Sequence, residues 1–321
     1  MQRRKLIAAL AVTSVVSGMT FAQDNSRPLR IVVPFPPGGA TDIAGRSLQE
    51  PLQRLLGQPV VIENKAGAGG SIGRAEVARA TDGLTFGVAT LSTHGVNPAV
   101  LGKLPYDPIK DFVGVTEIVK APGIIVVNPK VLPVKDFADL VKHLKAHPGK
   151  VEYATPGNGT IGHMWGELFK SATGTSMVHI PYRGAGPATN DVLGGQVPVY
   201  FDQVASSLPH VKAGKLKALA VSWHERLAVL PDVPTYAELG YKQANDASWF
   251  GLVAPKSTPA AQVQRVQQAV AQALKEPAVR DRLAAQGLYA SGTTPAEFSA
   301  QIAREIDKMK QVAAYAKIKL D

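Results

Sequence analysis

Glycine and small hydroxyl residues gather in short loops that follow apolar runs of this sequence. The clearest of these loops is Pro36-Pro37-Gly38-Gly39-Ala40-Thr41-Asp42, which follows the β-branched run 29–33. Prolines end a strand, glycines let the backbone approach a ligand, and a helix opening near Thr41 has first N–H groups without partners inside it. The turn therefore predicts an anion site made of main-chain donors, suited to a carboxylate. The alternative is an ordinary strand-to-helix turn in which Thr41 is the N-cap.

The same order of strand, small-residue loop and helix recurs along the chain. Apolar runs that predict strands, each followed by such a loop and a helical pattern, lie at 59–64, 84–90, 151–155, 177–182 and 197–201. This recurrence is typical of parallel sheets with crossover helices, where ligands bind outside the carboxyl ends of the strands. Loops from two such sheets would face one cleft. Within the first helix, Pro51 predicts a kink or a split.

The length of the chain predicts two lobes. Its 321 residues, 45% of them hydrophobic, exceed what one hydrophobic core usually serves. We expect residues 23–124 to form most of the first lobe and residues 125–248 the second, with a crossing near Val127-Asn128-Pro129. Residues 249–321 would return to the first lobe as an extended segment and C-terminal helices.

The first residues predict a signal peptide. Residues 3–5 are Arg-Arg-Lys, the apolar run 6–19 is too short to span a bilayer, and Thr20-Phe21-Ala22 is a small-residue cleavage pattern. We expect residues 1–22 to be removed by cleavage after Ala22 and the rest to be exported. No later run has the apolar length of a membrane helix. The sequence has no cysteine, which excludes disulfides and thiol catalysis.

The distribution of charge argues against one class of partner. The net charge of +10 falls to about +7 when the three positive residues at 3–5 leave with the signal peptide. The remaining positive residues are spread over helical patterns without interleaved aromatic residues or a dense basic block. We therefore expect no nucleic-acid binding. Steering of anionic solutes is the more natural use of this charge.

Several motifs together resemble one known family. They are Val33-Pro34-Phe35-Pro36-Pro37-Gly38-Gly39 with Asp42, the run 61–70, His179-Ile180-Pro181-Tyr182-Arg183-Gly184, Tyr106-Asp107-Pro108 and Val233-Pro234-Thr235. In them the chain is similar to the Bug (TctC-like) receptors of tripartite tricarboxylate transporters, over essentially the whole mature length. Lys65 departs from the pattern, because an arginine is commoner there.

The resemblance implies a fold and a function. The fold is an α/β two-lobed periplasmic binding protein of the Venus flytrap, type II-like class, with a mostly parallel sheet flanked by helices in each lobe. Such a receptor acts in the periplasm, as a monomer and without a cofactor. It closes on a di- or tricarboxylate, an acidic amino acid or an aromatic acid, and delivers it to membrane subunits of the transporter.

The resemblance also implies which residues contact the ligand. They are Phe35, Gly38, Gly39, Asp42 and Ser92 in the first lobe, and Asn158, Gly159, Thr160, His163, Gly184, Ala185, Gly186 and Asp202 in the second. Two of these have alternative roles. His163 could cap or pack a helix instead. Asp202 is either the N-cap of the helix after Phe201 or an acceptor for a ligand ammonium, a ligand hydroxyl or a bridging water.

Two motifs leave enzymatic alternatives open. Gly69-Gly70-Ser71-Ile72-Gly73 matches a nucleophile elbow, so a secreted serine hydrolase using Ser71 is the alternative function. That elbow needs serine directly after a strand, however, and the intervening run 65–70 favours Ser71 as a helix cap. The second motif, at 157–162, matches a dinucleotide fingerprint, but Tyr182-Arg183 stands where the acidic ribose ligand should be.

The histidines predict no metal site. His143 and His147 are four residues apart on one helical face, but no nearby carboxylate supplies a third ligand. No pair of a nucleophile or base with an orienting partner can be identified in the sequence either. We therefore expect a binding protein without catalytic residues, metal or cofactor.

Overall fold

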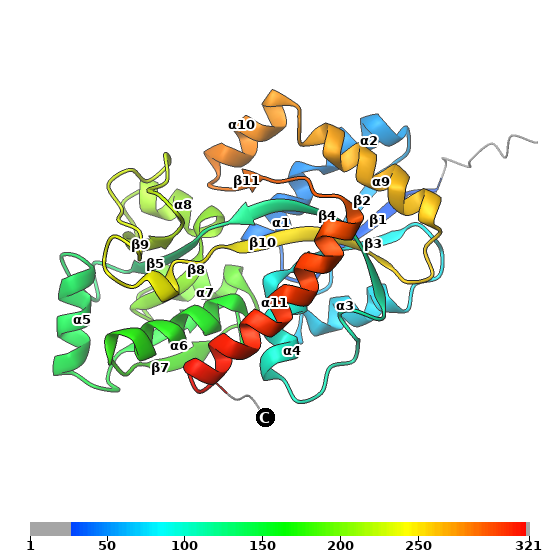
Figure 1. Ribbon diagram of the computed structural model, residues 1–321. Coiled ribbons are helices and arrows are strands. Elements are labelled where there is room, and N and C mark those ends of the chain that lie inside the picture. Colours follow the sequence, from blue (N-terminus) through cyan, green and yellow to red (C-terminus); the bar gives the residue numbers. More distant parts are fainter. Residues whose placement is uncertain (1–26, 319–321) are drawn as a thin grey trace, which may run out of the picture.

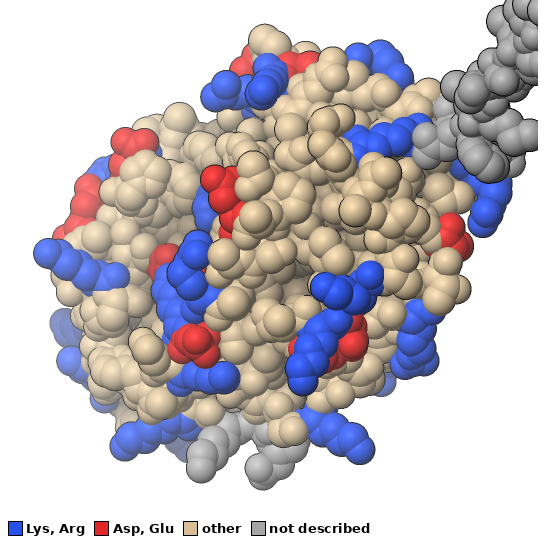
Figure 2. All heavy atoms as spheres, turned by 45° about the vertical axis from the view of Figure 1, so that its right-hand side comes forward, with Lys and Arg blue, Asp and Glu red and all other residues tan. Residues whose placement is uncertain are grey.

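The protein has two α/β lobes, as the computed structural model in Figure 1 shows for the described residues 27–318. The predicted signal peptide, 1–22, lies outside the described residues. Within residues 27–318, no helix has the length and apolar character needed to cross a membrane. Figure 2 shows Lys and Arg side chains scattered among neutral ones on the visible face, several of them beside acidic side chains.

The first lobe is built on a six-stranded sheet of order β11-β4-β10-β3-β1-β2. Its strands are β1 (Leu29–Val33), β2 (Val60–Asn64), β3 (Thr85–Thr90), β4 (Phe112–Ala121), β10 (Ser248–Pro255) and β11 (Tyr289–Ala290). Its helices are α1 (Ala40–Ser47), α2 (Gln49–Leu56), α3 (Ser71–Ala78), α4 (Asn97–Val100), α9 (Ala260–Ala273), α10 (Pro277–Ala285) and α11 (Pro295–Tyr315).

The second lobe is built on a five-stranded sheet of order β7-β6-β8-β5-β9. Its strands are β5 (Gly123–Val127), β6 (Glu152–Thr155), β7 (Val178–Pro181), β8 (Val199–Gln203) and β9 (Lys217–Ser222). Its helices are α5 (Phe137–Ala146), α6 (Ile161–Thr173), α7 (Ala185–Leu193) and α8 (Val204–Lys212).

Both sheets are mixed, so the expectation of mostly parallel sheets holds for only part of each. Strand β1 is parallel to β2 and β3, and β6 is parallel to β7 and β8, as the repeated strand-loop-helix order predicts. Strand β10 is antiparallel to β3 and β4, and β5 is antiparallel to β8 and β9. Strands β5 and β10 are buried at every residue. Their sequences are therefore continuous apolar runs that cannot be told from those of parallel strands.

The chain crosses to the second lobe at Pro122. Strand β4 ends at Ala121 in the first sheet, and β5 begins at Gly123 in the second, where it pairs with β8. The crossing predicted near Val127-Asn128-Pro129 is therefore wrong, because the chain is already in the second sheet there and these residues lie at the end of β5. Figure 1 shows β4 and the returning β10 lying side by side between the lobes. The exact lobe limits of 124 and 248 stay a proposal.

The first helix is split, as Pro51 predicts, but the break lies at Leu48. Helix α1 ends at Ser47 and α2 begins at Gln49, which places Pro51 in the first turn of α2. Proline is tolerated in a first turn because its missing N–H has no partner in the helix there. At the other end of the chain, α9 packs on α2 and β4, and α11 packs on β4. Phe298 of α11 lies directly against Gly251 of β10, where an added Cβ would be 2.1 Å from its ring.

Candidate ligand-binding cleft

Four helices begin around one small space between the lobes, which we call the inner cavity. Its volume is about 20 Å³. Helices α1, α6, α7 and α8 each contribute an N-cap or first-turn residue to its wall. The lining residues are Phe35, Gly39, Ala40, Thr41, Ser92, Pro156, Thr160, Ile161, Ala185, Gln203 and Phe250. A space of this size holds about one water, so the lobes are closed.

The electrostatics of the inner cavity suit an anion. Among the described residues that line it, none is charged. Each helix N-terminus carries about half a positive charge and first-turn N–H groups without partners inside the helix. Four such termini around one small space favour a small anionic group over a neutral or cationic one.

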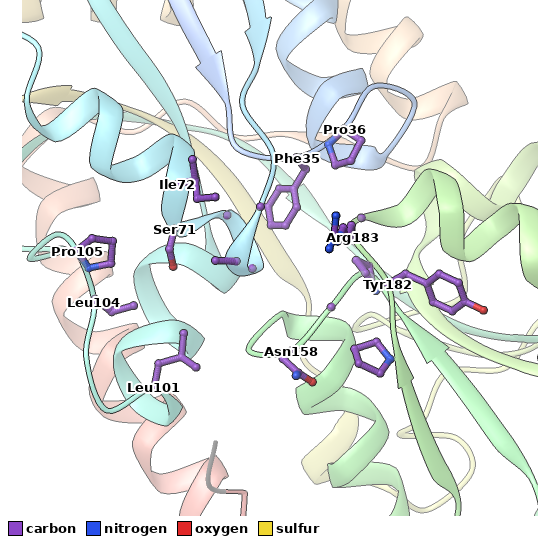
Figure 3. Close-up of a pocket in the computed structure, with 18 of the residues that line it drawn as sticks. Phe35, Pro36, Ser71, Ile72, Leu101, Leu104, Pro105, Asn158, Tyr182 and Arg183 are labelled. Atoms are coloured by element: carbon purple, nitrogen blue, oxygen red, sulfur yellow. The ribbon is translucent and has the colours of Figure 1, made fainter. Parts of the chain in front are cut away.

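A second, larger space adjoins the inner cavity, and we call it the outer cavity. Its volume is about 430 Å³, and Figure 3 shows it between the two lobes. The first lobe lines it with residues 67–72, Leu101 and 103–105, and the second lobe with 156–158 and 181–184. Phe35 and Pro156 line both cavities. The two spaces are therefore neighbouring parts of one cleft.

The lobes touch each other at close range across this cleft. The Ser92 Oγ accepts a hydrogen bond of 3.0 Å from the main-chain N–H of Ile161, the first residue of α6. Glycine makes room for several other contacts. A Cβ added to Gly69 would lie 2.7 Å from the Asn158 carbonyl oxygen, and one added to Gly184 would lie 2.4 Å from the Pro36 ring.

The structure brings seven of the predicted contact residues to the cleft. Phe35, Gly39, Ser92, Thr160 and Ala185 line the inner cavity, and Phe35, Asn158 and Gly184 line the outer one. Gly159 lies at the contact between the lobes, where an added Cβ would be 2.7 Å from Asn97 Oδ1. Gly186 faces the first lobe, where its added Cβ would be 3.6 Å from the Pro37 carbonyl oxygen. Their contacts with a ligand stay predictions.

The remaining first-lobe residues shape the turn after β1. The Asp42 carboxylate accepts hydrogen bonds from the Gly38 N–H at 3.0 Å, from Asn64 Nδ2 at 2.8 Å and from Arg46 Nε at 2.9 Å. Asp42 does not line either cavity and instead holds the turn in place. Thr41 is not the N-cap, because Gly39 has that position and Thr41 is inside α1.

His163 packs inside the second lobe and does not line either cavity. Its ring stacks on His179 with centroids 4.1 Å apart and planes 6° apart. Burial lowers the pKa of both histidines, that of His179 to about 3. The His179 Nε2 lies 2.7 Å from the Oγ1 of Thr155. Thr155 is the last residue of β6, directly before the loop that leads to α6. The cap of α6 is Thr160, whose hydroxyl accepts from the His163 N–H.

Asp202 lies inside β8 and not at the start of a helix. Helix α8 begins at Val204 with Gln203 as N-cap, so Asp202 is not the N-cap of this helix. Its Oδ2 accepts hydrogen bonds from the Ser206 and Ser207 hydroxyls, while its buried Oδ1 has no hydrogen-bond partner within the part of the chain that the structure describes. Burial raises the pKa of this carboxyl to about 6.

Replacing Asp202 by asparagine should stabilise the protein more at high pH than at low pH. Because the pKa is raised on folding, ionisation of Asp202 costs stability above about pH 6, and this cost disappears as the pH falls toward the unfolded value. The cost is on the order of 2–3 kcal/mol. We expect Asp202→Asn to raise Tm at pH 8, by an amount that shrinks toward pH 4.

The control is Asp281→Asn on the exposed face of α10. This substitution also removes one negative charge, but at a position exposed to solvent, so it should change Tm little at any pH. Thermal unfolding followed by circular dichroism across the pH range measures both variants. A Tm difference for Asp202→Asn that does not vary with pH would contradict the raised pKa.

Among residues 27–318, Ser71 has no neighbour that could act as its catalytic partner. It is the first residue of α3, and Gly70 is the N-cap, so the predicted capping role is wrong as well. Its Oγ accepts from Asn97 Nδ2 at 3.3 Å, and Tyr106 is its other hydrogen-bonding neighbour. Neither asparagine nor a buried tyrosine, whose pKa burial raises, serves as a general base for serine.

Sequence reasoning missed six residues of the inner cavity. Ala40, Thr41, Ile161 and Gln203 stand at helix starts after strands, and Pro156 directly follows β6, so these positions were a usable signal. No such signal marks Phe250 in the sequence, because β10 enters the first sheet between β3 and β4 from far along the chain.

Two lobes that meet around an uncharged cavity between helix N-termini define the class of two-lobed solute-binding proteins. The chain belongs to the tripartite tricarboxylate transporter receptor family, whose model matches residues 44–317. It is 37% identical to Protein BugT of Bordetella pertussis over 316 residues, which cover 98% of this chain and 96% of BugT. The family consists of solute-binding receptors and not of enzymes. The alternative of a serine hydrolase is therefore wrong.

Solved structures share the fold. One, described as a periplasmic transporter, is 47% identical with a TM-score of 0.89, and the match covers 92% of this chain and 98% of that one. An R. palustris protein solved with adipate is 34% identical with a TM-score of 0.88, and the match covers 91% of this chain and 98% of that one.

Proposed function

We propose that this protein captures a small carboxylate in the inner cavity and delivers it to the membrane subunits of a tripartite tricarboxylate transporter. The observation that carries the proposal is the meeting of four helix N-termini around a space without charged side chains. The R. palustris relative solved with adipate supports a carboxylate as the ligand. Di- and tricarboxylates, acidic amino acids and aromatic acids are the candidate ligands.

Capture requires the lobes to open and close. Residues of both lobes line the inner cavity in the closed form, so the carboxylate must enter while the lobes are apart. Closure then brings the first-turn N–H groups of α6 and α7 to the same anion as those of α1. Each hydrogen bond to a charged group contributes roughly 1.5–3 kcal/mol. In this closed form, the Ser92 hydroxyl accepts a hydrogen bond from the first N–H of α6.

The proposal includes the place and the partners of the receptor. Export with cleavage after Ala22 would release a mature receptor of residues 23–321 into the periplasm. There it would act as a monomer and without a cofactor. Its partners would be the carboxylate and the membrane subunits, and not nucleic acid. The basic net charge would steer anionic ligands toward the cleft.

A thermal-shift screen of the mature protein tests the proposal. The panel contains the candidate acids, and the controls are the matching neutral carboxamides. A ligand present at a hundredfold excess over Kd should stabilise the protein by about 2.7 kcal/mol. We expect at least one acid to raise Tm and its amide to leave it unchanged. If no acid raises Tm, or if the amides act equally, the proposed function is wrong.

A further inference from the structure

One fully buried side chain at the contact between the lobes has a polar atom without a hydrogen bond. It belongs to Asn97, the first residue of α4 in the first lobe. Among residues 27–318, its Oδ1 has no hydrogen-bond partner. This oxygen lies against the second lobe, because a Cβ added to Gly159, in the loop between β6 and α6, would be 2.7 Å from it. The closed form therefore buries an acceptor without a donor.

The amide nitrogen of the same side chain is held by its own lobe. Asn97 Nδ2 donates to the Gly69 carbonyl oxygen at 3.2 Å, to Ser71 Oγ at 3.3 Å and to Tyr106 Oη at 3.4 Å. The bond to Gly69 fixes which end of the amide is the nitrogen, because a carbonyl oxygen can only accept. The amide therefore cannot turn round to pair its oxygen without losing this bond.

Closure changes the surroundings of the two ends of this amide differently. The Nδ2 contacts lie within the first lobe, so they are present whether the lobes are open or closed. Gly159 covers the Oδ1 only when the lobes meet, and water reaches this oxygen when they separate. Asn97 lines neither cavity, so a ligand held there does not supply the missing donor. Closure therefore removes hydrogen bonds to water without replacing them, which costs free energy.

Ser92, a second polar side chain at the contact between the lobes, has the opposite effect. Its Oγ accepts a hydrogen bond from the N–H of Ile161 across the cleft, so closure gives this hydroxyl a partner. Ser92 therefore favours the closed form, and Asn97 opposes it. The balance of such groups decides how often the empty receptor closes.

We propose that Asn97 is a positioning residue that keeps the receptor open until a ligand compensates for the cost of burying its Oδ1. The inference rests on the opening and closing that the proposed function includes. The apparent affinity for any ligand is then lower than that of the closed form, in proportion to the fraction of empty receptor that is closed. In return, few empty receptors adopt the form that carries a ligand.

The variant Asn97→Ala tests this inference because it removes the buried acceptor. Small-angle X-ray scattering of the mature protein without ligand measures the radius of gyration, which falls as the lobes close. We expect a smaller radius for Asn97→Ala than for the native protein, with the ratio of closed to open forms raised on the order of tenfold. Every acid that binds in the thermal-shift screen should bind this variant more tightly by one common factor. A side chain that only supported the fold would give no such gain.

A second variant shifts the equilibrium the other way, and a third is the matched control. The carboxylate of Asn97→Asp has the shape of the amide but costs more to bury, so this variant should stay open and bind roughly tenfold more weakly or worse. The control is Asn128→Ala. Asn128 is also buried and lines neither cavity, but its Nδ2 donates to the Val192 carbonyl oxygen and its Oδ1 accepts from the Lys130 N–H. Its replacement should lower Tm without changing the radius of gyration or the affinity.

Several results would contradict this role of Asn97. One is a native protein that, without ligand, already has the radius of gyration of the closed form. Another is a folded Asn97→Ala variant with the native radius, or an equal change in Asn128→Ala. If Asn97→Ala does not fold by circular dichroism, Asn97→Asp decides, and native affinity in that variant overturns the inference. Failure of every acid to bind would overturn the proposed function, while scattering without ligand would still decide the role of Asn97.

Discussion

Replacing Ala185 by leucine is expected to lower the affinity for a carboxylate more than about a hundredfold while leaving the fold intact. Ala185 is the first residue of α7 and lines the inner cavity, and its Cβ would be 3.2 Å from a Cβ added to Gly39 of the other lobe. The cavity of about 20 Å³ cannot take the three extra carbon atoms together with a ligand. In the open form the leucine would face solvent, so the lobes can still fold. Isothermal titration calorimetry measures the loss.

The control for this variant is Ala285→Leu. Ala285 is an exposed residue at the end of α10, so the same added side chain there should leave the affinity unchanged. Circular dichroism checks that both variants are folded. If Ala185→Leu is folded and binds like the native protein, the carboxylate does not lie in the inner cavity.

Replacing Gly69 by alanine is expected to weaken carboxylate binding about tenfold by preventing full closure. Gly69 has a φ of +59°, and a Cβ added to it would lie 2.7 Å from the carbonyl oxygen of Asn158 in the second lobe. Contacts this short are not tolerated, so the two lobes must stay further apart. Because a ligand binds the closed form more tightly than the open one, its apparent affinity falls with the population of the closed form.

Gly57→Ala is a closely matched control for this substitution. Gly57 has a φ of +61°, almost the same as Gly69, but a Cβ added to it has nothing within 4 Å. Both variants pay about the same cost for alanine in the left-handed region, roughly 1 kcal/mol. Their Tm values should therefore fall by similar small amounts, while only Gly69→Ala loses affinity. Equal affinities would mean that the ligand-bound form is more open than this structure.

Local patterns predicted the elements that carry the site better than they predicted the roles of single residues. The strand Leu29–Val33 has the predicted bounds, and the loops after β1, β6 and β7 lead to helices as expected. The roles of Thr41, Ser71 and Asp202 as helix caps were wrong. A cap depends on where the backbone changes conformation, and a shift of one or two residues moves the role to a neighbour.

The sequence by itself determined which segments form strands, where glycine and proline interrupt them, and to which family the chain is similar. These properties follow from neighbouring residues, because apolar periodicity and turn chemistry act over a few positions. Only the tertiary structure decided which loops meet. The contact between Ser92 and Ile161 joins residues 69 positions apart, and Phe250 reaches the inner cavity by pairing with β3 and β4. The burial of Asp202 also depends on the packing of distant segments, which no local pattern encodes.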